Sequence, residues 1–403
     1  MKKNPRIIPD TYSYNLVIQS KLIPFSKSKS NKKISSISSS SIDKNLNSSV
    51  EPPPSENENK SIMPLDECYS LLESMKKGKK KSKPNIYTYN LVLNGITCLL
   101  NKNELSALSS KCLSLFDEIK SYKRIIKPDA FTYSTIMKLH LINLQNGEPE
   151  SMDKLISLID EMKDYFAPTS LHYNFVLKGL TFQMEGGNKS ALKNALAIFE
   201  QMKSSADPVA RPDLVNYKTL FSGIYKLMLA GDPDGSIANI ALNLFDELKI
   251  EALGNSNLKP DLSITNIILQ ILVHRAGEKD VVAAEKCLEI FDDMRANPQS
   301  VKPNTISYNI ALNALSKSAR TGDIFSVDRC LLIIQEMEES KKNQPTIISF
   351  CTAMKVLTKA AISKRNDYAY QKCLTFYANI QTKIQKNQMT IPDTLMIKML
   401  QKR

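Results

Sequence analysis

The stretch Pro84-Asn85-Ile86-Tyr87-Thr88-Tyr89-Asn90-Leu91 is the clearest copy of a phrase that recurs along this chain. It returns as Pro128-Asp129-Ala130-Phe131-Thr132-Tyr133-Ser134-Thr135, and other copies begin at Pro9, Pro168, Pro212, Pro260, Pro303 and Pro345. One position of the phrase holds Tyr89, Tyr133, Tyr173, Tyr217, Thr265, Tyr308 and Phe350, at successive separations of 44, 40, 44, 48, 43 and 42 residues. A period of this size indicates a solenoid, in which each unit buries its apolar face only against its neighbours.

Each copy also predicts two helices. After the proline, apolar side chains such as Tyr89, Val92 and Ile96 recur three and four residues apart, which is the spacing of one helix face. A second run with this spacing ends in Phe116-Asp117-Glu118-Ile119-Lys120 and in relatives of that phrase. A proline then stops the second helix and opens the next unit. The sequence therefore predicts an all-α chain of about eight helix-turn-helix repeats.

The repeats fill the chain apart from one polar tract. Residues 21–61 are rich in Ser, Asn, Lys and Pro and nearly lack aromatic residues, so we expect a disordered insert inside the first repeat. Residues 1–20 would then hold the first helix of that repeat, and residues 62–403 the rest of the solenoid. Because Pro392-Asp393 opens a further copy shortly before Arg403, we expect the sequence to be a piece of a longer protein.

The composition points to an anionic partner and away from catalysis. The chain of 403 residues has 54 Lys and Arg against 41 Asp and Glu, a formal net charge of +13, which suits nucleic acid or a membrane surface. No apolar run approaches the roughly 18 residues that span a bilayer. His140, His172 and His274 fall in separate repeats, and no Cys-x-x-Cys pair occurs. We therefore expect no zinc site, no other cofactor and no enzymatic activity.

Five of the seven cysteines share one slot of the repeat. Cys68, Cys112, Cys287, Cys330 and Cys373 each precede Leu or Tyr, and Ala195 and Ala241 fill the same slot in other copies. A position that alternates between Cys and Ala needs a small apolar side chain, because another helix packs closely there. We expect unpaired thiols and a reducing compartment.

The combined pattern closely resembles the pentatricopeptide repeat: a basic residue, Pro, Asp or Asn, two variable residues, then Thr/Ser-Tyr-Asn, and later Ala-Leu-x-Leu-Phe-Asp-Glu-Met. The resemblance covers the chain outside residues 21–61, although inserts between the helices make these units longer than the family consensus. It implies a right-handed α-solenoid whose first helices line a groove for single-stranded RNA, one repeat addressing one base. It also implies work in a mitochondrion or plastid, in RNA processing, stabilisation or translation.

In the family, two side chains per repeat read the base, one after the aromatic position and one after the next proline. The corresponding pairs here are Asn15 with Asn85, Asn90 with Asp129, Ser134 with Thr169, Asn174 with Asp213, Lys218 with Asp261, Asn266 with Asn304, Asn309 with Thr346, and Cys351 with Asp393. The resemblance implies U for the Asn90–Asp129 and Asn174–Asp213 pairs, C or U for the two Asn–Asn pairs, and a purine at Ser134. Side chains two places before the aromatic position would flank the stacked bases: Tyr12, Tyr87, Phe131, Leu171, Val215, Ile306 and Ile348.

The residues leave other interpretations open. Asp or Asn after Pro is an ordinary helix N-cap, and the flanking side chains could pack between repeats. Asn is a mediocre helix former, however, and it returns to one slot at Asn15, Asn90, Asn174, Asn266 and Asn309, which favours selection for something other than helicity. The competing function is a scaffold for protein partners, for example in an organellar ribosome or RNA-processing complex, because solenoid grooves also hold peptides.

Overall fold

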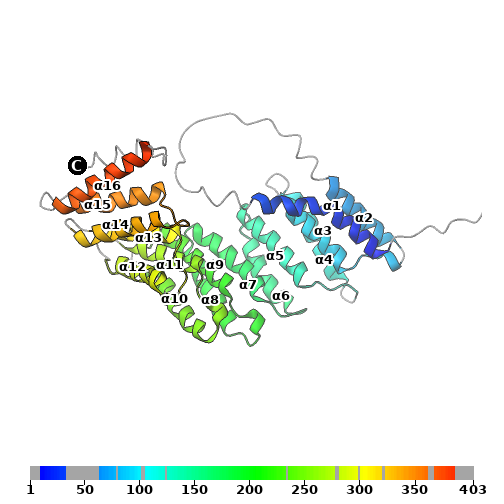
Figure 1. Ribbon diagram of the computed structural model, residues 1–403. Coiled ribbons are helices and arrows are strands. Elements are labelled where there is room, and N and C mark those ends of the chain that lie inside the picture. The colour runs from blue at the N-terminus through cyan, green and yellow to red at the C-terminus, as the bar shows by residue number, and fades with distance from the viewer. Residues whose placement is uncertain are drawn as a thin grey trace, which may run out of the picture. The chain divides into compact units, whose positions relative to one another are not determined.

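The computed structural model describes residues 10–32, 63–78, 80–100, 105–122, 125–232, 235–276, 281–297, 300–319, 323–361 and 367–385. Within these ranges the chain forms sixteen α-helices and no β-strand (Figure 1). The helices alternate as the repeat predicts: the odd-numbered ones follow the prolines, and the even-numbered ones follow the turns. We call them A helices and B helices. The prediction of an all-α chain of about eight helix pairs is confirmed.

The first of two compact units contains Met1–Gly179 and Ser204–Arg211. Its elements are α1 (Thr11–Lys32), α2 (Met63–Lys77), the 3₁₀ turn η1 (Lys80–Ser82), α3 (Ile86–Leu99), α4 (Leu105–Ser121), α5 (Ala130–Gln145), α6 (Ser151–Met162), the first part of α7 (Ser170–Glu185) and η2 (Pro208–Ala210).

The second unit contains Leu180–Lys203 and Pro212–Arg403. Its elements are the end of α7, α8 (Lys189–Lys203), α9 (Leu214–Ala230), α10 (Ser236–Gly254), η3 (Ser256–Leu258), α11 (Leu262–Arg275), α12 (Val281–Ala296), α13 (Thr305–Ser318), α14 (Ile324–Glu339), α15 (Ile347–Ala361) and α16 (Asp367–Gln385).

Within each unit the A helices form one layer and the B helices pack against it. In the first unit α3 contacts both α1 and α5, and α4 packs on α3 and α5. In the second unit α13 contacts α11 and α15, while α12 packs on α11 and α13. These A helices therefore touch their neighbours in the sequence of repeats, which is how a helical-repeat fold buries a continuous core. The handedness of the winding stays a prediction.

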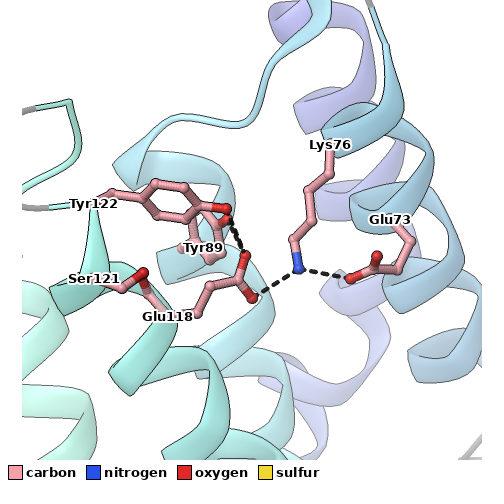
Figure 2. Close-up of polar contacts among 6 residues, drawn as sticks. All are labelled: Glu73, Lys76, Tyr89, Glu118, Ser121 and Tyr122. Carbon is pink, nitrogen blue, oxygen red and sulfur yellow. Dashed lines mark hydrogen bonds and ion pairs between the residues drawn. The ribbon is translucent and has the colours of Figure 1, made fainter.

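The aromatic position of the phrase is the centre of this core. Tyr89, Tyr133 and Tyr217 are completely buried, and each hydroxyl donates a hydrogen bond to a glutamate of a B helix. The Tyr89 hydroxyl reaches Glu118 Oε1 at 2.8 Å, and Figure 2 shows this carboxylate at the centre of a polar cluster. Because a buried hydroxyl is costly without a partner, the tyrosine and the glutamate together fix the A helix on its B helix.

Ion pairs link successive B helices. Lys76 at the end of α2 pairs with Glu118 of α4 at 2.7 Å and with Glu73 of its own helix at 2.6 Å (Figure 2). Lys120 of α4 lies 3.4 Å from Glu161 of α6 in the same way. In the second unit Lys203 pairs with Glu247 at 2.7 Å, and Arg295 pairs with Glu336. The basic residue near the C-terminus of each of these B helices thus interacts favourably with its own helix dipole and forms an ion pair with the B helix of the next repeat.

The small slot of the B helices is buried as predicted. Cys68, Cys112, Cys287 and Cys330 have no exposed surface, and neither have Ala195 and Ala241. Burial raises the pKa of the Cys112 thiol to about 12, so it remains protonated. Cys373 is half-buried, and all seven cysteines are free thiols. A glycine position on the A helices also allows close packing, because a Cβ on Gly223 would lie 2.8 Å from Thr181 Oγ1.

One predicted boundary is corrected. Helix α1 continues to Lys32, so residues 21–32, expected as the start of a disordered insert, are helical. Packing explains the first residues of this stretch: Leu22 is buried and lies over Gly95 of α3, and Lys21 pairs with Glu67 of α2. The rest of the expected insert, residues 33–61, lies outside the described residues. No described helix combines the length and the apolar character that crossing a bilayer requires.

Candidate nucleic-acid interface

The residues after the prolines cap the A helices. Asn85, Asp129, Asp213 and Asn304 each form a capping box with the side chain three residues later, and Asp261 accepts from Ile264 N–H. The N-cap interpretation is therefore correct for these positions. Capping uses only part of the capacity of an amide or carboxylate, because such a group offers up to four hydrogen-bonding directions. The donors and lone pairs that capping leaves unused determine what the site can bind.

Asn90 and Asp129 are brought together by the packing of α3 on α5. Asn90 Nδ2 donates to Asp129 Oδ1 at 3.0 Å and Oδ2 at 3.1 Å. Thr132, the third residue of α5, donates to Asn90 Oδ1 at 2.8 Å. Asn90 is 6% exposed and Asp129 is half-buried. The two side chains thus hold each other, and a second amide N–H and carboxylate lone pairs remain for a ligand.

The second unit repeats this arrangement. Asn266 Nδ2 donates to Asn304 Oδ1 at 3.3 Å, and Ser307 Oγ donates to Asn266 Oδ1 at 2.7 Å. At the next junction Ser349 Oγ donates to Asn309 Oδ1 at 2.6 Å and lies 3.1 Å from Thr346 Oγ1. The hydroxyl three residues after the cap therefore orients the Asn of the preceding repeat. This role is not visible in the sequence alone, although Thr132, Ser307 and Ser349 occupy one repeat position.

Ser134 and Thr169 are joined through a third side chain, His172 of α7. The ring lies 3.3 Å from Ser134 Oγ through Nε2 and 2.9 Å from Thr169 Oγ1 through Nδ1. His172 is 1% exposed, and burial lowers its pKa. The imidazole is therefore neutral at pH 7. In the sequence, His172 is only one of three histidines in separate repeats, so this contact is not visible there.

The other predicted pairs are arranged differently. Asn15 Oδ1 is buried and lacks a hydrogen-bond partner among the described residues, while Asn85 caps α3. Lys218 Nζ donates to Ser263 Oγ at 2.9 Å instead of reaching Asp261. Asn174 and Asp213 lie in different units: the first is buried on α7 and the second caps α9. Cys351 is half-buried, and its predicted partner Asp393 lies outside the described residues.

The side chains expected to flank bases are exposed, so they are not core residues. They are Tyr12, Tyr87, Phe131, Leu171, Val215, Ile306 and Ile348, with exposed fractions between 49% for Tyr87 and 70% for Tyr12. Tyr87 lies one turn before Asn90 on the same face of α3, and Phe131 follows Asp129 by two residues. An aromatic or branched apolar side chain thus accompanies each of these polar positions at the start of an A helix.

No protein-family model matches the chain, and no curated protein matches it. Two crystal structures of the pentatricopeptide repeat protein PPR10 with an 18-nt psaJ RNA element, one of them a cysteine-to-serine variant, are similar at 16% identity and a TM-score of 0.44. The match covers 91% of this chain and 50% of that chain, so the chain spans half the length of those proteins. PPR10 from maize matches at 16% identity and a TM-score of 0.31, over 96% of this chain and 60% of that one.

The stacked helix pairs, each opened by the same sequence phrase, define a helical-repeat protein. The chain is pentatricopeptide repeat-like, both in the recurring phrase and in the helix pairs that the phrase opens. No group of three or more His, Cys, Asp or Glu side chains that could hold a metal ion occurs among the residues that the structure describes.

Proposed function

We propose that this protein binds single-stranded RNA and reads it with one repeat per base. The observation that carries the proposal is the Asn90–Asp129 pair, hydrogen bonded at 3.0 Å, with the half-exposed Tyr87 on the helix of Asn90 and the half-exposed Phe131 on the helix that Asp129 caps. A base that stacks beside either ring turns its Watson–Crick edge toward the pair. The pair retains one amide donor and carboxylate acceptors, which complement the O4 acceptor and the N3–H donor of uracil.

The same chemistry recurs in the second unit, where Asn266 and Asn304 form the pair and Ile306 provides the exposed flank. Two amides can present a donor or an acceptor, which suits both C and U. The formal net charge of +13 supplies attraction to the phosphate backbone without sequence preference. Base reading and charge together support selective RNA binding.

The biological setting is also a proposal. The resemblance to pentatricopeptide repeats supports a role in organellar RNA processing, stabilisation or translation, in a mitochondrion or plastid. The alternative is a scaffold for protein partners, and the experiment below favours it if the protein shows no base selectivity.

The test is a selection of bound sequences from a random RNA pool at near-physiological salt, followed by affinity measurements on the selected RNA. We expect a pyrimidine-rich motif with U at the base facing Asn90–Asp129. Asn90→Ala should weaken binding of that RNA about tenfold, since one base contact is worth roughly 1–3 kcal/mol. Asn194→Ala, which replaces an exposed Asn on the B helix α8, is the matched control. Salt-sensitive binding without a motif would overturn base reading and favour the scaffold.

A further inference from the structure

His172 stands at a repeat position that holds a short hydroxyl in most other repeats, Asn216 and Ile264 being the exceptions. It is three residues after the cap Thr169, where Thr88, Thr132, Ser307 and Ser349 stand in their own helices. Those hydroxyls can rotate, so they donate or accept as the neighbours require. An imidazole has no such freedom, because one ring nitrogen donates and the other accepts when the ring is neutral.

The hydrogen bonds determine which nitrogen carries the proton. The backbone N–H of Thr169 donates to His172 Nδ1 at 3.1 Å, so Nδ1 is the acceptor and Nε2 carries the hydrogen. Because Nδ1 carries no hydrogen, Thr169 Oγ1, 2.9 Å away, can only donate to it, and it shares the single Nδ1 lone pair with the backbone N–H. Nε2 lies 3.3 Å from both Ser134 Oγ and Ala130 O, toward which its N–H points.

With His172 in place, the two hydroxyls offer opposite hydrogen-bonding roles to a ligand: Thr169 accepts and Ser134 donates. The Thr169 proton is engaged with Nδ1, so its oxygen presents only lone pairs to a ligand. A serine inside a helix usually donates to the carbonyl four residues earlier, as Thr135 does to Phe131 O at 2.8 Å. For Ser134 that carbonyl is Ala130 O, which faces Nε2. The Ser134 proton thus remains available as a donor.

The resulting polarity matches that of the neighbouring Asn90–Asp129 pair: a donor from the A helix and an acceptor from the next cap. If that pair reads uracil, the donor meets the exocyclic oxygen and the acceptor meets the ring N–H. Only the keto bases, guanine and uracil, offer this combination in the same orientation. Ser and Thr end one bond short of Asn and Asp, which leaves room for the larger guanine.

We infer that His172 is a positioning residue that makes this repeat select a keto base, guanine above all, by fixing the hydroxyls of Ser134 and Thr169. The inference rests on the proposed RNA-reading function. The ring is well held: it is buried, and its centroid lies 5.7 Å from that of Phe166, which packs at 5.6 Å on Tyr133. His172 itself does not touch the base.

The experiment uses the whole chain and the selected RNA, varying only the base that faces Ser134 and Thr169, next to the uracil expected at Asn90–Asp129. Guanine and inosine, which share O6 and N1–H, should bind about tenfold tighter than adenine, the size of one well-formed base contact. His172→Ser reproduces the Thr346–Ser349 arrangement already present in this chain, so it should fold. Its free hydroxyls should reduce the guanine-to-adenine ratio about tenfold, to near one. His172→Thr, which copies the residue found at Thr132, is the second variant if the first loses helical content.

Two readouts separate this inference from the proposed function. The uracil preference at the base facing Asn90–Asp129 should persist in both variants, and His274→Asn, which removes an exposed imidazole of α11, should change neither ratio. A folded His172→Ser protein that keeps the full ratio would overturn the role of His172, as would a wild-type preference for adenine or cytosine. Loss of the uracil preference in the wild type would instead overturn base reading itself.

Discussion

Glu118 should couple the A and B layers of the second repeat, and a double-mutant cycle can measure that coupling. Its carboxylate accepts from the buried Tyr89 hydroxyl at 2.8 Å and pairs with Lys76 at 2.7 Å (Figure 2). Tyr89→Phe removes a hydrogen bond to a charged group, worth about 1.5–3 kcal/mol. Glu118→Ala strands the Tyr89 hydroxyl and leaves Lys76 with Glu73 alone, so we expect a loss of about 3 kcal/mol.

In the double variant the hydroxyl is no longer stranded, so the combined loss should fall short of the sum by about 2 kcal/mol. The assay is hydrogen exchange of the α3 and α4 amides, because repeat arrays can unfold locally. Tyr308→Phe is the control, since Tyr308 is buried but its hydroxyl has no hydrogen-bond partner among the described residues. Additive losses, or equal losses for Tyr89→Phe and Tyr308→Phe, would refute the reasoning.

Three further predictions concern stability. Burial, assisted by the charge of Lys154, lowers the pKa of His140 from 6.5 to about 4. The unfolded chain therefore binds more protons in this window, and stability should be complete above pH 6.5 and decline toward pH 4 by at most roughly 1.4 kcal/mol per pH unit. The urea midpoint of His140→Asn should depend less on pH, and an unchanged dependence would contradict this. Cys112→Ala should cost about 1 kcal/mol or less, whereas Cys112→Leu should cost about 1–3 kcal/mol by overpacking, as measured by urea unfolding. Gly223→Ala should lower the free energy of unfolding, because the new Cβ would lie 2.8 Å from Thr181 Oγ1. Gly254→Ala, whose new Cβ has no atom within 4 Å, should instead raise it by up to about 1 kcal/mol in the same urea assay.

Much of the architecture could be predicted because each repeat position has a constant environment. The prolines predicted the starts of the A helices, and the alternation of Cys and Ala predicted the buried slot that Cys112 and Ala195 share. The flanking side chains such as Tyr87 are exposed, and their contact with bases stays a prediction. The end of α1 was missed because composition argued for disorder, whereas Leu22 continues the packing onto Gly95.

The sequence indicates which positions form the candidate site, but not which hydrogen bonds their side chains make. Asn90 and Asp129 were paired by resemblance, and their hydrogen bond depends on how α3 packs on α5. Lys218 occupies the same repeat position as Asn90 but forms a different contact, since its side chain is long enough for the ammonium group to reach Ser263. His172 could not be found by pairwise reasoning, because it acts on Ser134 only after α5 and α7 are adjacent.

The repeat, the helix starts at the prolines and the buried positions can be derived from the sequence alone, because they follow from local periodicity and residue size. Which polar atoms meet depends on how the helices pack: Glu118 meets Tyr89 and Lys76, Thr132 meets Asn90, and His172 meets Ser134 and Thr169. Hydrogen bonds are sensitive to tenths of an ångström and to angle, and residues about 40 positions apart acquire that precision only when neighbouring helices pack.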